Sequence, residues 1–125
     1  MMTDSPKTRP RALLTPVALH ILMSLAEGTR HGYGIKRDVE EATGGALHLG
    51  PGTLYEAMHR MEEQGWVEVV DPDTLRDEPD FDARRKYYAL TDAGRAEMES
   101  ELARLDELLE HAREHSLMPR KRDTR

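Results

Sequence analysis

Hydrophobic side chains recur at intervals of three or four in three short segments of the first half of the chain. Positions spaced in this way lie on one face of an α-helix, so each segment is predicted to be an amphipathic helix. Thr15 followed by Pro16 favours the start of the first helix, and Gly44–Gly45 and Gly65 favour the ends of the second and third. The repeating positions are Val17, Ile21 and Leu25, then Ile35, Val39 and Ala42, then Leu54, Met58 and Met61.

The hydrophobic period changes after the third helix. Residues 66–70 and 84–90 are rich in Val and Tyr, which predicts two β-strands. Residues 71–83 between them are too many for a tight turn and are rich in Asp and Pro, so we expect a mobile hairpin loop. Tyr87 and Tyr88 occupy successive strand positions, and one of the two rings is therefore expected to face the core.

A long final helix is predicted from residue 91 onward, with Thr91–Asp92 at its start. Its apolar positions form a heptad-like seam at Met98, Leu102, Leu105, Leu109 and Ala112. A helix of this length extends beyond a small core, so we predict that the seam is a dimer interface. Packing of the same seam within one chain is the alternative.

Together these elements predict a mostly α fold with a small β-hairpin: a winged helix-turn-helix followed by a long C-terminal dimerisation helix. The expected organisation is a flexible basic arm at 1–12, a winged helix-turn-helix domain at 13–90, a dimerisation helix at 91–117 and a basic tail at 118–125.

Composition narrows the class of protein. The chain has no cysteine and no apolar run approaching the roughly 20 residues of a membrane span, so we expect a cytoplasmic protein. No Gly-rich phosphate loop and no nucleophile motif is present, which argues against an enzyme, and no cofactor is expected.

The formal net charge is −6, yet basic residues cluster at 7–11, 84–86 and 120–122. Because binding depends on where positive charge lies, this balance is compatible with a basic face on an acidic body.

The third helix has the features that double-stranded DNA requires. Its outer face carries short or polar side chains, Thr53, Glu56, His59 and Arg60, which suit the major groove. Its start, Pro51–Gly52–Thr53, offers backbone N–H groups that suit a phosphate. Arg84, Arg85 and Lys86 open the second predicted strand, where a wing contacts the DNA backbone.

Three stretches resemble the PadR family of bacterial transcriptional regulators. They are His31-Gly32-Tyr33-Gly34-Ile35, then Gly52-Thr53-Leu54-Tyr55 through Arg60-Met61-Glu62 and Gly65, then Arg85 to Thr91 followed by Asp92-Ala93-Gly94-Arg95. The resemblance covers about residues 13–112 and corresponds to the branch of the family with a single C-terminal helix. It implies a homodimer that binds a palindromic promoter site, usually as a repressor.

The resemblance implies that Tyr33, Thr53, Tyr55 and the basic wing residues lie at the DNA surface, and the remaining positions come from the residue pattern itself. The expected DNA-binding residues are Tyr33, Lys36, Gly52, Thr53, Tyr55, His59, Arg60, Arg84, Arg85 and Lys86. The C-terminal helix is expected to pack against the N-terminal region of the partner. The expected dimer interface is Leu14, Val17, Ile21, Met98, Leu102, Leu105, Leu109 and Ala112. Some relatives bind flat aromatic ligands between tryptophans of this helix, whereas the one tryptophan here, Trp66, begins the wing.

Two alternatives stay open at this point. A winged helix can bind protein instead of DNA, as an adaptor or co-regulator, and the acidic balance and loop 71–83 favour that interpretation slightly. A small-molecule effector would have its natural site in the dimer cleft between the first and last helices. His111 and His115 have a spacing that can hold a metal, but we expect them to lie in solvent and predict no metal site.

Overall fold

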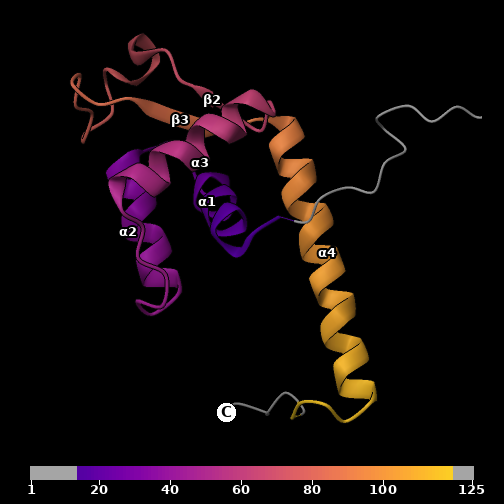
Figure 1. The fold of residues 1–125 in the computed structure, drawn as a ribbon. Coiled ribbons are helices and arrows are strands. Elements are labelled where there is room, and N and C mark those ends of the chain that lie inside the picture. Colours follow the sequence, from indigo (N-terminus) through magenta and orange to yellow (C-terminus); the bar gives the residue numbers. More distant parts are fainter. Residues whose placement is uncertain (1–13, 120–125) are drawn as a thin grey trace, which may run out of the picture.

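The computed structural model describes residues 14–119, so the arm predicted at 1–12 and residues 120–125 of the predicted tail lie outside the described part. The elements, shown in Figure 1, are α1 (Pro16–Ala26), β1 (Arg30–His31), α2 (Gly32–Ala42), α3 (Pro51–Glu63), β2 (Val67–Val69), the 3₁₀ helix η2 (Pro72–Leu75), β3 (Tyr87–Leu90) and α4 (Asp92–Glu114). No helix within residues 14–119 is both long and apolar enough to cross a lipid bilayer.

The starts of α1 and α4 agree with the sequence signals. Thr15 Oγ1 accepts a hydrogen bond from Ala18 N at 3.1 Å, and Pro16 is the first helical residue. Thr91 Oγ1 accepts one from Gly94 N at 3.0 Å. Each hydroxyl satisfies a backbone N–H that the first turn of a helix leaves without a partner. The predicted caps are therefore confirmed.

The sheet has one strand more than the predicted hairpin. Its order is β1-β3-β2, and both pairs are antiparallel, with Arg30 opposite Tyr88 and Val67 opposite Leu90. Strand β1 has only two residues, too few for a period-two pattern to predict it from the sequence. Because β1 leads directly into α2, its pairing with β3 holds the start of α2 beside the wing.

The second wing strand starts later than predicted. Arg84, Arg85 and Lys86 precede β3 and belong to the turn that leads into it. The cause is Asp82, whose Oδ1 accepts the Arg84 backbone N–H at 3.0 Å and so bends the chain. The three basic residues therefore extend from a turn and not from a strand.

The acidic loop before this turn contains more local structure than a mobile loop would. Asp71 Oδ1 accepts a hydrogen bond from Asp73 N at 3.0 Å at the start of η2. At the other end of the loop, Asp82 N donates to the Tyr87 hydroxyl at 3.0 Å. These bonds hold both ends of the loop, residues 71–83, in position.

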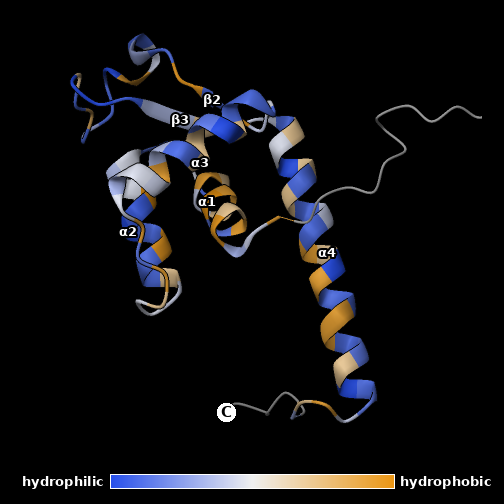
Figure 2. Ribbon diagram, viewed as in Figure 1, coloured by the Kyte–Doolittle hydropathy of each residue, from blue (hydrophilic) through white to orange (hydrophobic). Residues whose placement is uncertain are grey.

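The core lies between the three short helices and the sheet. Ile21 and Leu22 of α1 and Ile35 and Val39 of α2 are its largest fully buried side chains. Leu54, Met58 and Met61 form the buried face of α3, as the helical period predicted. Tyr88 is buried and Tyr87 is half-buried, which confirms that one of the two rings faces the core. Figure 2 shows α1 as the most hydrophobic helix, surrounded by the others.

The long helix α4 packs against α1 near its start and then extends away from the body (Figures 1 and 2). Along the predicted seam, Met98 is buried, Leu102 and Leu105 are partly buried against the core, and Leu109 is 41% exposed. Ile21 and Met98 are covered by their own chain, with Ile21 at 0% exposure. Both side chains therefore stabilise the single chain, and the dimer interface stays a prediction.

Gly94 is predicted to be essential for the position of α4. A Cβ atom at this residue would overlap the Trp66 carbonyl oxygen, a backbone atom that cannot rotate away. We expect Gly94→Ala to lower the free energy of unfolding in urea by about 1–3 kcal/mol, the usual cost of overpacking. Gly52→Ala is the control, because nothing lies within 4 Å of its Cβ position. Equal stability of the two variants would contradict this account.

Candidate nucleic-acid interface

Three elements meet at one groove: the start of α2, the start of α3 and the turn before β3. The groove has a volume of about 560 Å³, and two tyrosines on its wall are unusually exposed, Tyr33 at 55% and Tyr55 at 67%. The other lining residues are His31, Gly32, Lys36, Pro51, Leu54, Met58, Arg85, Lys86 and Tyr88. An aromatic ring that folding leaves in water offers a large contact area to a ligand.

The rim of the groove is cationic. Lys36, Arg85 and Lys86 line it, and none of the described residues that line it is acidic. Lys36 Nζ is also paired with Glu40 at 3.1 Å, whereas Lys86 Nζ lies 5.8 Å from the centre of the Tyr88 ring. An apolar floor below a positive rim suits a molecule with both apolar and anionic parts. The sugar–phosphate backbone of DNA is such a molecule.

Tyr33 lies between two arginines. The guanidinium carbons of Arg37 and Arg85 are each 5.9 Å from its ring centre, a cation–π distance. Arg37 is not among the residues predicted to bind DNA. Its position four residues after Tyr33 is the signal that predicts this contact, because residues i and i+4 share a helical face.

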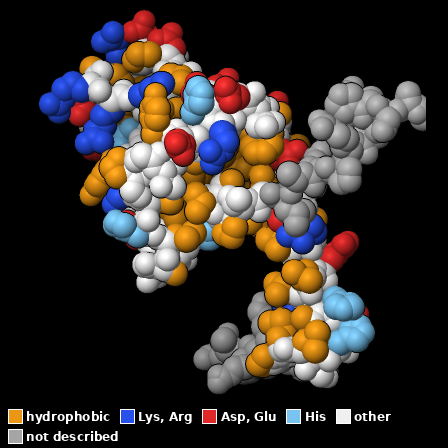
Figure 3. Space-filling model, viewed as in Figure 1, with side chains coloured by type: hydrophobic (Ala, Val, Ile, Leu, Met, Phe, Trp, Pro, Cys, Tyr) orange, Lys and Arg blue, Asp and Glu red, His pale blue; other side chains and the backbone are white. Residues whose placement is uncertain are grey.

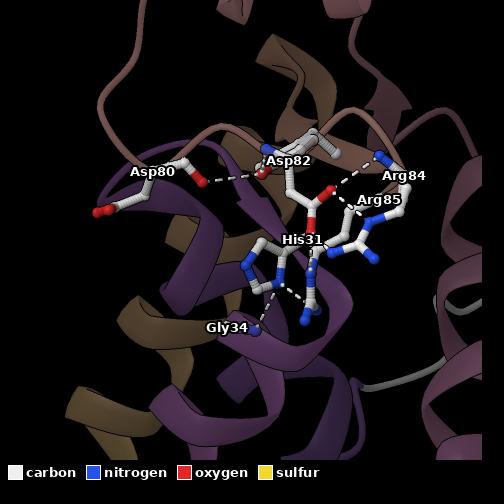
Figure 4. A network of polar contacts seen from close by, with 7 residues as sticks. His31, Gly34, Asp80, Asp82, Arg84 and Arg85 are labelled. Atoms are coloured by element: carbon white, nitrogen blue, oxygen red, sulfur yellow. Dashed lines mark hydrogen bonds and ion pairs between the residues drawn. The ribbon is translucent and has the colours of Figure 1, made fainter.

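His31 joins the start of α2 to the wing, as Figure 4 shows. Its Nδ1 accepts a hydrogen bond from Gly34 N at 3.1 Å, so the side chain caps α2. The ring packs edge-on against Tyr87 with 5.3 Å between centres, and Arg85 Nη1 lies 3.4 Å from Nδ1. The pKa of His31 is lowered, first by burial and then by repulsion from Arg85 and Arg37. The neutral ring is thus the form that accepts the capping bond.

The predicted DNA-binding residues divide into groups. Tyr33, Lys36, Tyr55, Arg85 and Lys86 line the groove together. Gly52 and His59 are exposed, and His59 Nε2 is 3.4 Å from a Glu63 oxygen. Thr53 and Arg60 are also exposed but lie on the other flank of α3.

That other flank forms a separate groove against α1. Its volume is about 400 Å³, and Thr53 and Arg60 line it together with Leu14, Val17 and Trp66. Trp66 is partly buried against the core. Thr53 and Arg60 are therefore separated from the tyrosine groove by the width of α3.

Arg84 differs from its neighbours because a carboxylate holds it. Its side chain is 89% exposed, yet its Nη2 lies 3.1 Å from Asp82 Oδ2. Figure 3 shows lysine and arginine side chains, with several acidic ones among them, gathered at the wing end of the molecule. Acidic residues therefore interrupt the basic face with which the sequence is compatible.

The histidines near the end of α4 show no sign of a metal site. The rings of His111 and His115 are exposed and lie 4.2 Å apart between centres. His115 Nδ1 is 3.0 Å from the His111 carbonyl oxygen, so this nitrogen has a partner on the backbone. Within residues 14–119, no group of three or more potential ligands is placed to hold a metal ion.

Three helices, a small antiparallel sheet and a long last helix define a winged helix protein, the class predicted from the sequence. More specifically, residues 21–100 match the family model described as "Transcriptional regulator PadR-like family". The chain belongs to this family of transcriptional regulators.

Curated proteins of related sequence include the transcriptional regulator Rv3488 of Mycobacterium tuberculosis. It is 32% identical over 93 residues, which are 74% of this chain and 78% of Rv3488. An uncharacterised 37.1 kDa protein of transposon TN4556 from Streptomyces fradiae is 35% identical over 81 residues, 65% of this chain. The chain spans only 20% of that larger relative.

Solved structures with the same fold include a complex of hsRosR-S4, at 31% identity with a TM-score of 0.57 over 72% of this chain and 69% of that one. Bacillus subtilis PadR in complex with operator DNA has a TM-score of 0.54 at 22% identity, over 69% of this chain and 46% of that one. At that identity the second likeness concerns the fold alone.

The cap at His31 predicts a pH dependence of stability. The folded chain lowers the pKa of His31 below its ordinary value of 6.5. The contribution of the neutral His31 ring to the free energy of unfolding is therefore fully present above pH 6.5. It is lost as the pH falls below that value, because the unfolded chain then binds a proton that the folded chain does not. His31→Asn keeps a capping oxygen but cannot titrate.

We expect the wild type to lose more unfolding free energy than His31→Asn between about pH 8 and about pH 5 in urea titrations. The remaining histidines titrate in both proteins and cancel in this comparison. Identical losses would mean that the cap is not coupled to protonation.

Proposed function

We propose that the chain is a sequence-specific DNA-binding regulator that occupies a palindromic promoter site as a homodimer and acts as a repressor. The observation that carries the proposal is the groove of exposed Tyr33 and Tyr55 below a rim of Lys36, Arg85 and Lys86. Exposed aromatic rings beside cations at the start of a helix and a wing suit a DNA backbone better than a protein surface.

In the proposed complex, α3 enters the major groove. Its outer face presents Gly52, Glu56 and His59, all exposed, while Tyr55 lies on the flank that faces the wing turn. The N-cap residue, Gly50, makes no side-chain capping bond. The N–H groups of the first turn are then available to a phosphate, which the positive end of the helix dipole also favours.

The homodimer is proposed from the apolar far half of α4. Leu108 is 53% exposed and Leu109 is 41% exposed on a helix that extends beyond the body, and Figure 3 shows hydrophobic side chains gathered there. Leu14, just before α1, and Val17 of α1, also expected at the interface, are only partly buried. Exposed leucines on a helix without a neighbour favour association with a second copy.

The family and fold are those of transcriptional regulators, and we propose no enzymatic activity.

A small-molecule effector also belongs to the proposal, in the cleft that a dimer would form between α1 and the last helices. Within one chain, Leu14 and Trp66 line the groove between α1 and α3. A protein-adaptor role is the outcome to consider if DNA binding fails.

Lys86→Ala tests the interface. Fluorescence anisotropy would measure binding to a duplex from the chain's own upstream region and to an unrelated duplex of equal length. We expect the variant to bind both about 25- to 100-fold more weakly near 0.1 M salt, because each chain of the dimer loses one phosphate contact. The slope of log affinity against log salt should become shallower by about 1.8, about 0.9 for each chain.

Arg95→Ala removes an equal charge from the first turn of α4 and should leave binding unchanged. Equal effects of Lys86→Ala and Arg95→Ala would place the interface elsewhere. Equal, weak and salt-insensitive binding of both duplexes by the wild type would overturn DNA binding itself.

Leu109→Asp tests the dimer. A carboxylate buried between two chains without a partner is strongly unfavourable, so sedimentation should show a monomer at concentrations where the wild type is a dimer. Ala103→Asp adds the same charge at an exposed position of α4 away from the seam and should remain a dimer. A dimeric Leu109→Asp protein would exclude the far half of α4 as the interface.

A further inference from the structure

The positive charge of the wing turn, residues 84–86, is partly neutralised by a nearby acidic residue. Asp82 accepts three hydrogen bonds from Arg84: the side-chain Nε at 3.1 Å, Nη2 at 3.1 Å and the backbone N at 3.0 Å. The same carboxylate lies 3.5 Å from Arg85 Nε. Two of the three basic residues of this turn are thus paired with one acidic residue, as the close view in Figure 4 shows.

Asp82 is held in position for this role. Its backbone N–H donates to the Tyr87 hydroxyl, and the Tyr87 ring stacks on Phe81 with 5.6 Å between centres. The side chain of Asp82 is only 26% exposed, although that of its partner Arg84 is 89% exposed. The carboxylate is therefore anchored, whereas the guanidinium that it binds is open to solvent and to a ligand.

The arrangement matches the way a guanidinium binds phosphate. Arg84 makes two parallel N–H···O bonds to the two oxygens of Asp82, the bidentate geometry that arginine also forms with phosphate. The bonds from Arg84 hold the pKa of the Asp82 carboxyl well below its usual range, so the group is ionised at neutral pH.

We propose that Asp82 is an internal competitor for the DNA phosphates that Arg84 and Arg85 would otherwise bind. A DNA strand must displace the carboxylate from Arg84 before this side chain can contact it. The wing then presents less positive charge to DNA than its three basic residues suggest. This inference rests on the proposed function, because it concerns the strength of the same DNA contact.

The neighbouring loop supplies a matched control in Asp80. Its carboxylate points away from the arginines in Figure 4, and among the ion pairs of residues 14–119 none involves Asp80. Asp80→Asn and Asp82→Asn remove the same charge from the same loop, two residues apart. The asparagine at 82 also keeps an oxygen that can accept the Arg84 backbone N–H, which preserves the turn.

The experiment compares the wild type and the two variants by fluorescence anisotropy on a duplex of unrelated sequence, over about 50 to 200 mM salt. We expect Asp82→Asn to bind about five- to tenfold tighter than Asp80→Asn near 0.1 M salt, with a slope steeper by up to about 1.8, because each chain of the dimer gains a phosphate contact. Arg84→Ala, made in both backgrounds, should weaken binding less than twofold with Asp82 present and about fivefold with Asn at 82.

Three outcomes would overturn the inference. Equal binding by the two Asn variants would show that only overall charge matters. Weaker binding by Asp82→Asn, with the thermal midpoint unchanged, would show that the carboxylate positions the arginines for DNA and does not compete with it. A loss of affinity on Arg84→Ala that is the same in both backgrounds would show no coupling. Failure of the proposed function looks different, since then no protein in the set binds DNA in a salt-dependent way.

Discussion

The relative positions of the third helix, the wing and the last helix depend on one junction at Thr91. Its hydroxyl donates to the Gly65 carbonyl at 2.6 Å and accepts from Gly94 N, and its backbone N–H donates to the Trp66 carbonyl at 3.0 Å. Gly65, at φ +81°, ends α3, and the next residue begins the wing. A single threonine thus joins the end of the proposed recognition helix to the first turn of the helix that we propose for dimerisation. A change in the direction of α4 would therefore be transmitted to α3 by bonds that leave little freedom.

The position of α2 at the proposed DNA interface depends on strand β1. Its pairing with β3 places Arg30 opposite Tyr88 and His31 opposite Tyr87, so the start of α2 lies against the wing. Arg30 Nε is also paired with Asp38 at 3.0 Å, and Ser24 of α1 donates to the same carboxylate at 2.7 Å. These partly buried bonds join α1, β1 and α2. Tyr33 and Arg85 therefore meet across a framework that is hydrogen-bonded on both sides of the groove.

The parts of this fold that the sequence predicted are those with a local cause. Caps at Thr15 and Thr91 and the apolar face of α3 follow from a few neighbouring residues, and each was confirmed. The features that the sequence did not predict depend on contacts with residues far away in the sequence. Strand β1 exists only because β3, more than fifty residues later, pairs with it. The buried position of Ile21 depends on the other helices that surround α1, which a helical period cannot distinguish from a face reserved for a partner. His31 lines the groove, and Arg37 approaches the Tyr33 ring, through this tertiary arrangement.

The pairing of the basic residues with other groups affects function more than their number does. From the sequence, Arg84, Arg85 and Lys86 are equivalent positive charges. In the fold, Arg84 faces a carboxylate, Arg85 is divided between Asp82 and the Tyr33 ring, and Lys86 lies near the Tyr88 ring. Lys36 is likewise paired with Glu40. A chain with net charge −6 whose interface cations are partly paired has a weak long-range attraction to DNA. Selectivity must then come from contacts that form only when the two surfaces fit, and the exposed tyrosines and the polar face of α3 are the groups placed to make them.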